Sequence, residues 1–325
     1  MTLHVTHTKW YHPNGVMVFT ENMLSTMDEM GIDYREHEGW RTSPDRKHFG
    51  LITMTASNLS LRAFASLRKP SLSMALTIPG TMQYVVDLGN PDGKVYNIGE
   101  YVQQRLMSSA MKASNSYLTN TRSVANAIRM RKGTEGKEIT IVPVPVDPVF
   151  SPGNIPRSGD TISFLTIGKL TKRREGLLRI PGLLRESLPG EKIEIATVGP
   201  WCENIDKLSV QCAVNGIAHK RYPAKPNRSL PEFYRSASCY LYISDFEGYS
   251  MTPKEALACG TPCLISHNAV HDEIYTGKPG VTFLDGPESV VRAVEMGHSP
   301  AYGDWARGDT WHDVTQQILE ELGLY

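Results

Sequence analysis

Several features that would assign this chain to a special class are missing from its sequence. Lysine and arginine total 34 and aspartate and glutamate total 34, so the chain has no net charge. No apolar run reaches the roughly 18 residues that a membrane-spanning helix requires. The opening residues, MTLHVT, lack the basic and apolar regions of a signal peptide. We therefore expect a soluble globular protein in the cytoplasm.

Cysteine is scarce, and repeats and low-complexity tracts are absent. The five cysteines are an odd number and fall mostly inside expected strands and helices. This usage favours reduced thiols in a cytosolic compartment. Cys259 and Cys263 straddle a Gly-Thr-Pro turn without the His and Cys partners of a zinc site. We therefore expect buried thiols and no structural zinc.

Strands and helices alternate along the chain, which predicts an α/β fold with parallel sheets covered on both faces. Five prolines between residues 143 and 156 mark a connector. We therefore predict one Rossmann-like domain over 1–150 and a second over 151–308. The expected strands are 3–6, 49–55, 72–78, 116–119, 139–143, 162–167, 193–198 and 240–243, and the expected helices are 16–30, 59–67, 98–113, 124–130, 177–188 and 205–214.

The most informative segment is SDFEGYSMTPKEALACGTPCLIS, residues 244–266. An apolar strand ends before it, a glycine-bearing turn follows, and Thr252 with Pro253 predicts a helix start. Gly260 marks the end of that helix. A helix N-terminus at the carboxyl end of a sheet suits a phosphate group. Glu247 and Glu255 bracket this expected site.

The same segment resembles the donor-binding motif of retaining glycosyltransferases of group 1 (family 4-like), with seven residues between two glutamates and then Glu-Ala-x-Ala-x-Gly-x-Pro. The resemblance implies the GT-B fold, in which two Rossmann-like, doubly wound domains face each other across a cleft. It also implies a nucleotide diphosphate sugar as donor, with a UDP-sugar as first candidate, and no cofactor. Glu255 would hold ribose hydroxyls, Glu247 would hold sugar hydroxyls, and the backbone of Gly248, Tyr249, Ser250 and Met251 would hold the distal phosphate.

A cluster of cations after the first strand of the second half, GKLTKRREG over 168–176, supports this reading. The family pattern is Gly-Arg-Leu followed by Lys-Gly, and Lys169, which follows Gly168, takes the arginine place. Arg174 is the first choice for the lysine place and Arg173 the second. Departure of a diphosphate builds negative charge that such cations neutralise. No Asp-x-Asp metal motif is present, so the resemblance implies metal-independent catalysis with Lys169, Arg174 and Glu247 as the catalytic groups.

The first half offers weaker signals. The loop that ends at Gly15 resembles the glycine loop near the donor and acceptor, which makes His12 and Asn14 candidates. Thr77 lies where many relatives have Thr-x-His, but the histidine is missing here, and only His12 or His7 could replace it. In the family the last helix, here within 309–325, packs back on the N-terminal domain.

The acceptor is the least defined part of the prediction. Residues 57–132 contain ten Lys and Arg against three Asp and Glu, a surplus of about +7 that favours an anionic acceptor such as DNA or a phosphate-bearing glycan or lipid. A looser resemblance, resting on size and charge, is to viral glycosyltransferases that modify hydroxymethylated pyrimidines in DNA, which would place the protein in host cytoplasm. The alternatives of another class are a sugar-phosphate phosphorylase or epimerase, and a non-catalytic module that binds nucleotide sugars or nucleic acid.

Overall fold

The computed structural model describes residues 3–7, 15–38, 50–53, 73–77, 116–130, 135–153 and 159–321. The chain divides into two compact units. Unit 1 comprises Met1–Val144 together with Asp309–Tyr325, and unit 2 comprises Pro145–Gly308. The sequence placed the first boundary a few residues later, at 150, and the second at 308.

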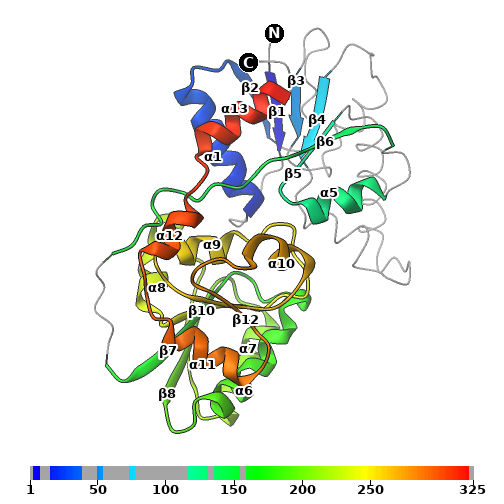
Figure 1. The fold of residues 1–325 in the computed structure, drawn as a ribbon. Helices are drawn as coiled ribbons and strands as arrows, with labels where there is room; N and C mark the ends of the chain where they lie inside the picture. The colour runs from blue at the N-terminus through cyan, green and yellow to red at the C-terminus, as the bar shows by residue number, and fades with distance from the viewer. Residues whose placement is uncertain are drawn as a thin grey trace. The chain divides into compact units, whose positions relative to one another are not determined.

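Unit 1 contains a six-stranded parallel sheet with the order β2-β1-β3-β4-β5-β6 (Figure 1). Strand β2 was not expected, because its sequence, YREHE, carries no apolar run. The helices that the structure describes in this unit include α1 and α13. The strands are β1 (Leu3–His7), β2 (Tyr34–Glu38), β3 (Gly50–Thr53), β4 (Ser73–Thr77), β5 (Ser116–Thr119) and β6 (Glu138–Ile141), and the helices are α1 (Gly15–Glu29), α5 (Arg122–Arg129) and α13 (Trp311–Glu321).

The C-terminal helix α13 packs within unit 1. Its Trp311 ring meets the Phe19 ring of α1 edge to face, with 5.2 Å between centroids. Near its other end, Glu321 accepts a hydrogen bond of 2.7 Å from Thr140 on β6. Val314, Ile318 and Leu319 of α13 are buried, as the helical spacing of apolar residues requires.

Unit 2 contains a second parallel sheet with the order β12-β11-β10-β7-β8-β9. Successive residues of its strands enter different cores, so that Phe164 and Leu241 join one apolar cluster while Leu165 and Tyr240 join the other. Helices therefore cover both faces of the sheet. The strands are β7 (Thr161–Ile167), β8 (Lys192–Val198), β9 (Ala218–Tyr222), β10 (Cys239–Tyr242), β11 (Cys263–Ile265) and β12 (Val281–Phe283).

The helices of unit 2 form two groups, one on each face of the sheet. Leu184 of α6, Leu208 of α7 and Val290 of α11 pack in one core cluster. Tyr234 of α8 and Leu257 of α9 pack in the other. The helical segments are η2 (Lys172–Arg179), α6 (Ile180–Ser187), α7 (Glu203–Val214), η3 (Asn227–Ser229), α8 (Leu230–Ser236), α9 (Met251–Ala258), α10 (Ala269–Tyr275), α11 (Pro287–Glu295) and α12 (Ala301–Ala306).

Helix α9 begins earlier than the sequence predicted. Its N-cap is Ser250, not Thr252, so Pro253 occupies the third helical position, which is still within the turn that tolerates proline. Gly260 follows the C-cap with φ of +82° and ends the helix as expected. The shift places the start of the helix directly after the Glu247 turn.

The described residues give no helix long and apolar enough to span a membrane. Within the same residues, no group of three or more His, Cys, Asp or Glu side chains is arranged to hold a metal ion. All five cysteines are free thiols, and four of them are buried.

Candidate functional site

The carboxyl ends of β7 and β8 lie backbone against backbone. Gly168 follows β7 with φ of +103°, a conformation that favours glycine, and its N–H donates to the carbonyl of Val198 at 2.8 Å. A Cβ atom on Gly199 would lie 2.7 Å from the Gly168 carbonyl oxygen, so only glycine fits there. This close approach fixes the loop that carries the exposed side chain of Lys169.

Glu247 lies in the loop between β10 and α9, and its carboxylate is immobilised. The side chain is only 3% exposed. Its Oε1 accepts hydrogen bonds from the Tyr242 hydroxyl at 2.8 Å and the Ser244 hydroxyl at 2.9 Å. Its Oε2 lies 3.2 Å from Nη1 of Arg173. The carboxylate is thus oriented by three side chains.

The two neighbouring arginines of η2 have different surroundings. The side chain of Arg173 is 24% exposed and pairs with Glu247. Arg174 is 3% exposed, donates from Nη1 to the Ile167 carbonyl at 2.9 Å, and places its guanidinium 4.8 Å from the centre of the Tyr242 ring. Consecutive helical residues point in different directions, so only one of the two side chains can enter the core. Here that residue is Arg174, although sequence reasoning ranked it first for contact with a ligand.

A backbone hydrogen bond joins η2 to the loop between β10 and α9. The Asp245 N–H donates to the Arg173 carbonyl at 2.9 Å. The structure therefore brings Arg173 and Glu247 together through main chain as well as side chain. For Lys169 it shows an exposed side chain in the adjoining turn.

Glu255 lies on α9 with its side chain turned into unit 2. It is 5% exposed, and its Oε2 accepts a hydrogen bond from the Tyr234 hydroxyl at 2.7 Å. Burial raises the pKa of Glu255 to about 7, the Tyr234 hydrogen bond opposes that shift, and the charge of Asp147 adds to it. The carboxyl group is therefore poised to change its charge near neutral pH.

The start of α9 has an unusual cap. The hydroxyl of Ser250 makes no capping bond and instead lies 2.8 Å from Nε2 of His271. Nδ1 of His271 lies 2.6 Å from the Ser266 carbonyl, which can only accept, so Nδ1 carries the proton and Nε2 accepts from Ser250. Burial lowers the pKa of His271, in keeping with a neutral imidazole. Since Ser250 does not cap α9, the first turn of the helix suits an external anion.

Sequence reasoning did not identify His271. The residue is fully buried on α10, and Tyr275 of the same helix donates its hydroxyl to the Ser250 carbonyl. Two side chains from α10 therefore hold the residue that precedes α9. The only signal in the sequence was the segment HNAVHDEI, which gives no hint of a partner 21 residues earlier.

The remaining predicted residues are placed as follows. Gly248 is buried and Tyr249 is partly buried, with the Lys254 ammonium 5.8 Å from the centre of the Tyr249 ring. In unit 1, His12 and Asn14 lie outside the described residues. Gly15 is the first residue of α1, Thr77 is the last residue of β4, and His7 is the last residue of β1. The predictions for these side chains stay predictions.

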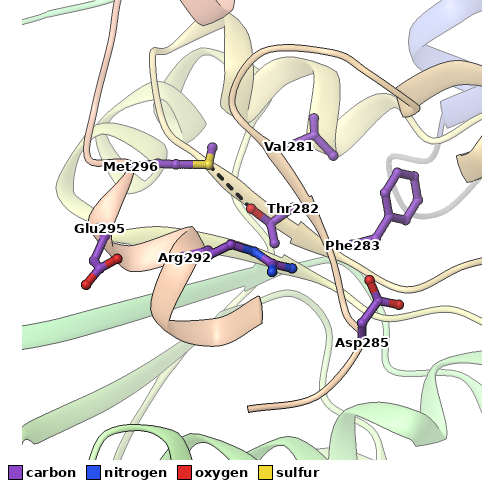
Figure 2. A pocket seen from close by; sticks show the side chains of 7 residues that line it. All are labelled: Val281, Thr282, Phe283, Asp285, Arg292, Glu295 and Met296. Carbon is purple, nitrogen blue, oxygen red and sulfur yellow. Dashed lines mark hydrogen bonds between the residues drawn. The ribbon is translucent and has the colours of Figure 1, made fainter. Parts of the chain in front are cut away.

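A pocket of about 660 Å³ lies elsewhere in unit 2, between β12 and α11 (Figure 2). Arg292 crosses it, but Asp285 and Glu295 also line it, so it offers no surplus of positive charge for a diphosphate. None of the predicted site residues contributes to this pocket. Its lining residues are Val281, Thr282, Phe283, Asp285, Arg292, Glu295 and Met296.

The fold is that of the GT-B glycosyltransferases. Residues 159–295 match the model of the family described as glycosyl transferases group 1. Over the full chain, the structure resembles HepE of Anabaena in complex with UDP and glucose, with a TM-score of 0.70, 11% identity and 100% coverage of both chains. It also resembles sucrose-phosphate synthase of Thermosynechococcus elongatus, with a TM-score of 0.66, 14% identity and coverage of 99% and 96%.

A relative in sequence is the mannosylfructose-phosphate synthase of Agrobacterium fabrum, strain C58. It is 26% identical over 182 residues, which are 48% of this chain and 39% of the relative. The chain thus matches well under half the length of this relative. Together with the family model, these likenesses confirm the predicted resemblance to GT-B glycosyltransferases of group 1 and the predicted fold class.

Proposed function

We propose that this chain is a glycosyltransferase that moves a sugar from a nucleotide diphosphate sugar to an acceptor hydroxyl, with retention of configuration. A UDP-sugar is the first candidate for the donor. The observation that carries the proposal is the ion pair of Glu247 and Arg173 directly before α9, together with the buried carboxyl group of Glu255 on that helix. HepE, whose structure holds UDP and glucose, supports the choice of nucleotide.

Glu255 would bind the ribose of the donor. An ionised carboxylate accepts hydrogen bonds only, and two vicinal hydroxyls can donate to its two oxygens. Tyr234 holds Oε2 and thereby fixes the orientation of the carboxylate. Because burial disfavours the charged form in the free protein, part of the binding free energy of the ribose hydroxyls would be used to keep Glu255 ionised.

The diphosphate would lie between the start of α9 and the cations after β7. Its departure from the sugar increases the negative charge on its oxygens, and positive groups already in place stabilise that change most. Lys169 and Arg173 would supply this charge, with Arg173 in the role that the sequence gave first to Arg174. We propose that these cations suffice, so that catalysis requires no divalent metal.

Glu247 would hold hydroxyls of the transferred sugar. Its Oε1 already accepts two hydrogen bonds, and its Oε2 faces Arg173. A sugar hydroxyl would therefore share Oε2 with Arg173 rather than displace the Tyr242 or Ser244 contacts. This arrangement links the position of the sugar to the cation that meets its leaving group.

The acceptor would carry a phosphate group. The names of the sucrose-phosphate and mannosylfructose-phosphate synthases support a phosphorylated sugar as the first candidate. DNA remains the second candidate, on the surplus of positive charge in 57–132. Of those cations only Arg122 and Arg129, both on α5, are among the described residues.

Donor turnover tests this proposal. The chain would be incubated with UDP-glucose and a panel of sugar phosphates, duplex DNA and hydroxymethylated DNA, with detection of UDP and of the product by NMR. We expect UDP release that depends on a phosphate-bearing acceptor and a product with the anomeric configuration of the donor. An inverted product would contradict retention. Donor affinity without turnover on any acceptor would favour a binding module, and turnover without a hydroxyl acceptor would favour a phosphorylase or epimerase.

A further inference from the structure

An indole side chain is exposed where β8 leads into α7. Trp201 is 71% exposed, which is unusual for the largest apolar side chain. It follows the close contact between Gly199 and Gly168 at the carboxyl end of the sheet. Neither the donor motif nor the cation cluster includes it. The carboxyl edge of a parallel sheet is where ligands bind in α/β folds, and an aromatic ring there offers a face for contact.

One carboxylate holds this indole together with an arginine. Asp206 of α7 accepts from Trp201 Nε1 at 3.1 Å through its Oδ2. Through Oδ1 it accepts from Arg221 Nη1 of β9 at 2.8 Å. Both bonds restrict exposed side chains that would otherwise sample several rotamers. An aromatic face and a guanidinium are thus positioned before any ligand arrives.

The pair lies beside the loop proposed to hold the diphosphate. Asn204, at the start of α7, donates from Nδ2 to the Leu170 carbonyl at 3.1 Å, and Leu170 follows Lys169 directly. The Gly199 N–H donates to the Tyr222 carbonyl at 3.1 Å, which joins the end of β8 to the end of β9. The chain on either side of Trp201 is therefore tied to the Lys169 loop and to β9, which carries Arg221.

From these contacts we infer that Trp201 and Arg221 form the subsite for the nucleobase of the donor, an inference that rests on the proposed function. The indole offers a face on which a base stacks. Arg221 has five N–H groups and uses Nη1 for Asp206, so its other donors are available to carbonyl oxygens of a base. Such a pair favours a keto-bearing base, uracil or guanine. Adenine presents an amino group beside its ring nitrogen and fits these donors less well.

Binding calorimetry on the full chain tests the inference with UDP, GDP, ADP and inorganic pyrophosphate. We expect Trp201→Ala to weaken binding of the preferred keto nucleotide roughly 5- to 150-fold, the range for losing one stacked base. Pyrophosphate affinity stays unchanged, and Trp201→Phe keeps most of the nucleotide affinity. Arg221→Met should reduce the ratio between the affinity for the preferred keto nucleotide and the affinity for ADP. The tighter of UDP and GDP identifies the base.

The matched control is Val214→Ala, which removes another exposed apolar side chain, 76% exposed, from α7, the helix that follows Trp201. It should leave all affinities unchanged. Nucleotide binding that is unaltered in Trp201→Ala would overturn the inference and leave the proposed function standing. An equal loss for UDP and pyrophosphate would also overturn it, because it would show an effect on the loop rather than on the base. Failure of the unmodified chain to bind any nucleotide would contradict the proposed function itself.

Discussion

The raised pKa of Glu255 leads to a specific dependence of nucleotide affinity on pH. Burial raises this pKa to about 7, so roughly half of the carboxyl groups are charged at pH 7 in the free protein. Ribose hydroxyls would bind the charged form, since only that form accepts through both oxygens. The charged fraction is about 0.9 at pH 8 and about 0.1 at pH 6. Because apparent affinity scales with the competent fraction, the dissociation constant should rise about tenfold between pH 8 and pH 6.

The measurement is calorimetric titration with a nucleoside diphosphate at half-unit intervals of pH. The phosphate groups of the nucleotide also titrate in this range, so the same series is run with Glu255→Gln. The amide in that variant cannot titrate, and its affinity should follow only the nucleotide. The ratio of the two affinities at each pH then isolates the effect of ionising the Glu255 carboxyl group. An equal slope in both proteins would refute the reasoning, because it would show that the charge of Glu255 does not meet the ligand.

Three further predictions concern the same side chains. Arg174→Met should lower the free energy of unfolding by about 2 to 4 kcal/mol, because it leaves buried acceptors on β7 without a donor. Arg173→Met should weaken nucleotide binding without a comparable loss of stability in thermal denaturation. The reverse pattern would contradict the roles given to the two arginines. Since the pKa of Glu255 is raised in the folded state, its charged form destabilises the free protein as pH rises through about 7. The gain in unfolding free energy from Glu255→Gln, measured by urea denaturation, should therefore be larger at pH 8 than at pH 5 by up to about 3 kcal/mol. A gain that does not change with pH would show that Glu255 titrates normally. Turnover should survive excess EDTA, and a loss restored by magnesium or manganese would exclude charge stabilisation by Lys169 and Arg173 alone.

The sequence predicted the buried strands better than the edge strands. Strand β10, with the sequence CYLY, is buried throughout, so its apolar run was a sufficient signal. Strands β2 and β9 read YREHE and AHKRY, and β9 has exposed or partly exposed side chains throughout. Edge strands face water and carry charge, so their composition does not separate them from loops. They form because a neighbouring strand offers hydrogen-bonding groups, which is information that lies outside the segment.

In the candidate site too, features within one segment could be predicted from the sequence, and features that depend on distant segments could not. The spacing of Glu247 and Glu255 was visible because one lies in a short turn and the other in the helix that directly follows it. The orientation of Arg173 and Arg174 was not, because it depends on which side chain reaches the ring of Tyr242 on β10. The bond between Ser250 and His271 joins residues that are 21 positions apart and required the packing of α10 against α9.

The most direct test of the central claim is the affinity of the full chain for UDP, measured by calorimetry in parallel with three variants. The account predicts that UDP binds the unmodified chain, that Glu255→Ala weakens it, and that Lys169→Ala combined with Arg173→Ala weakens it further. Glu288→Ala, which alters an exposed glutamate on α11, should have no effect. Equal UDP affinity in all four proteins, or no binding to any of them, would contradict the claim that this end of unit 2 is the donor site.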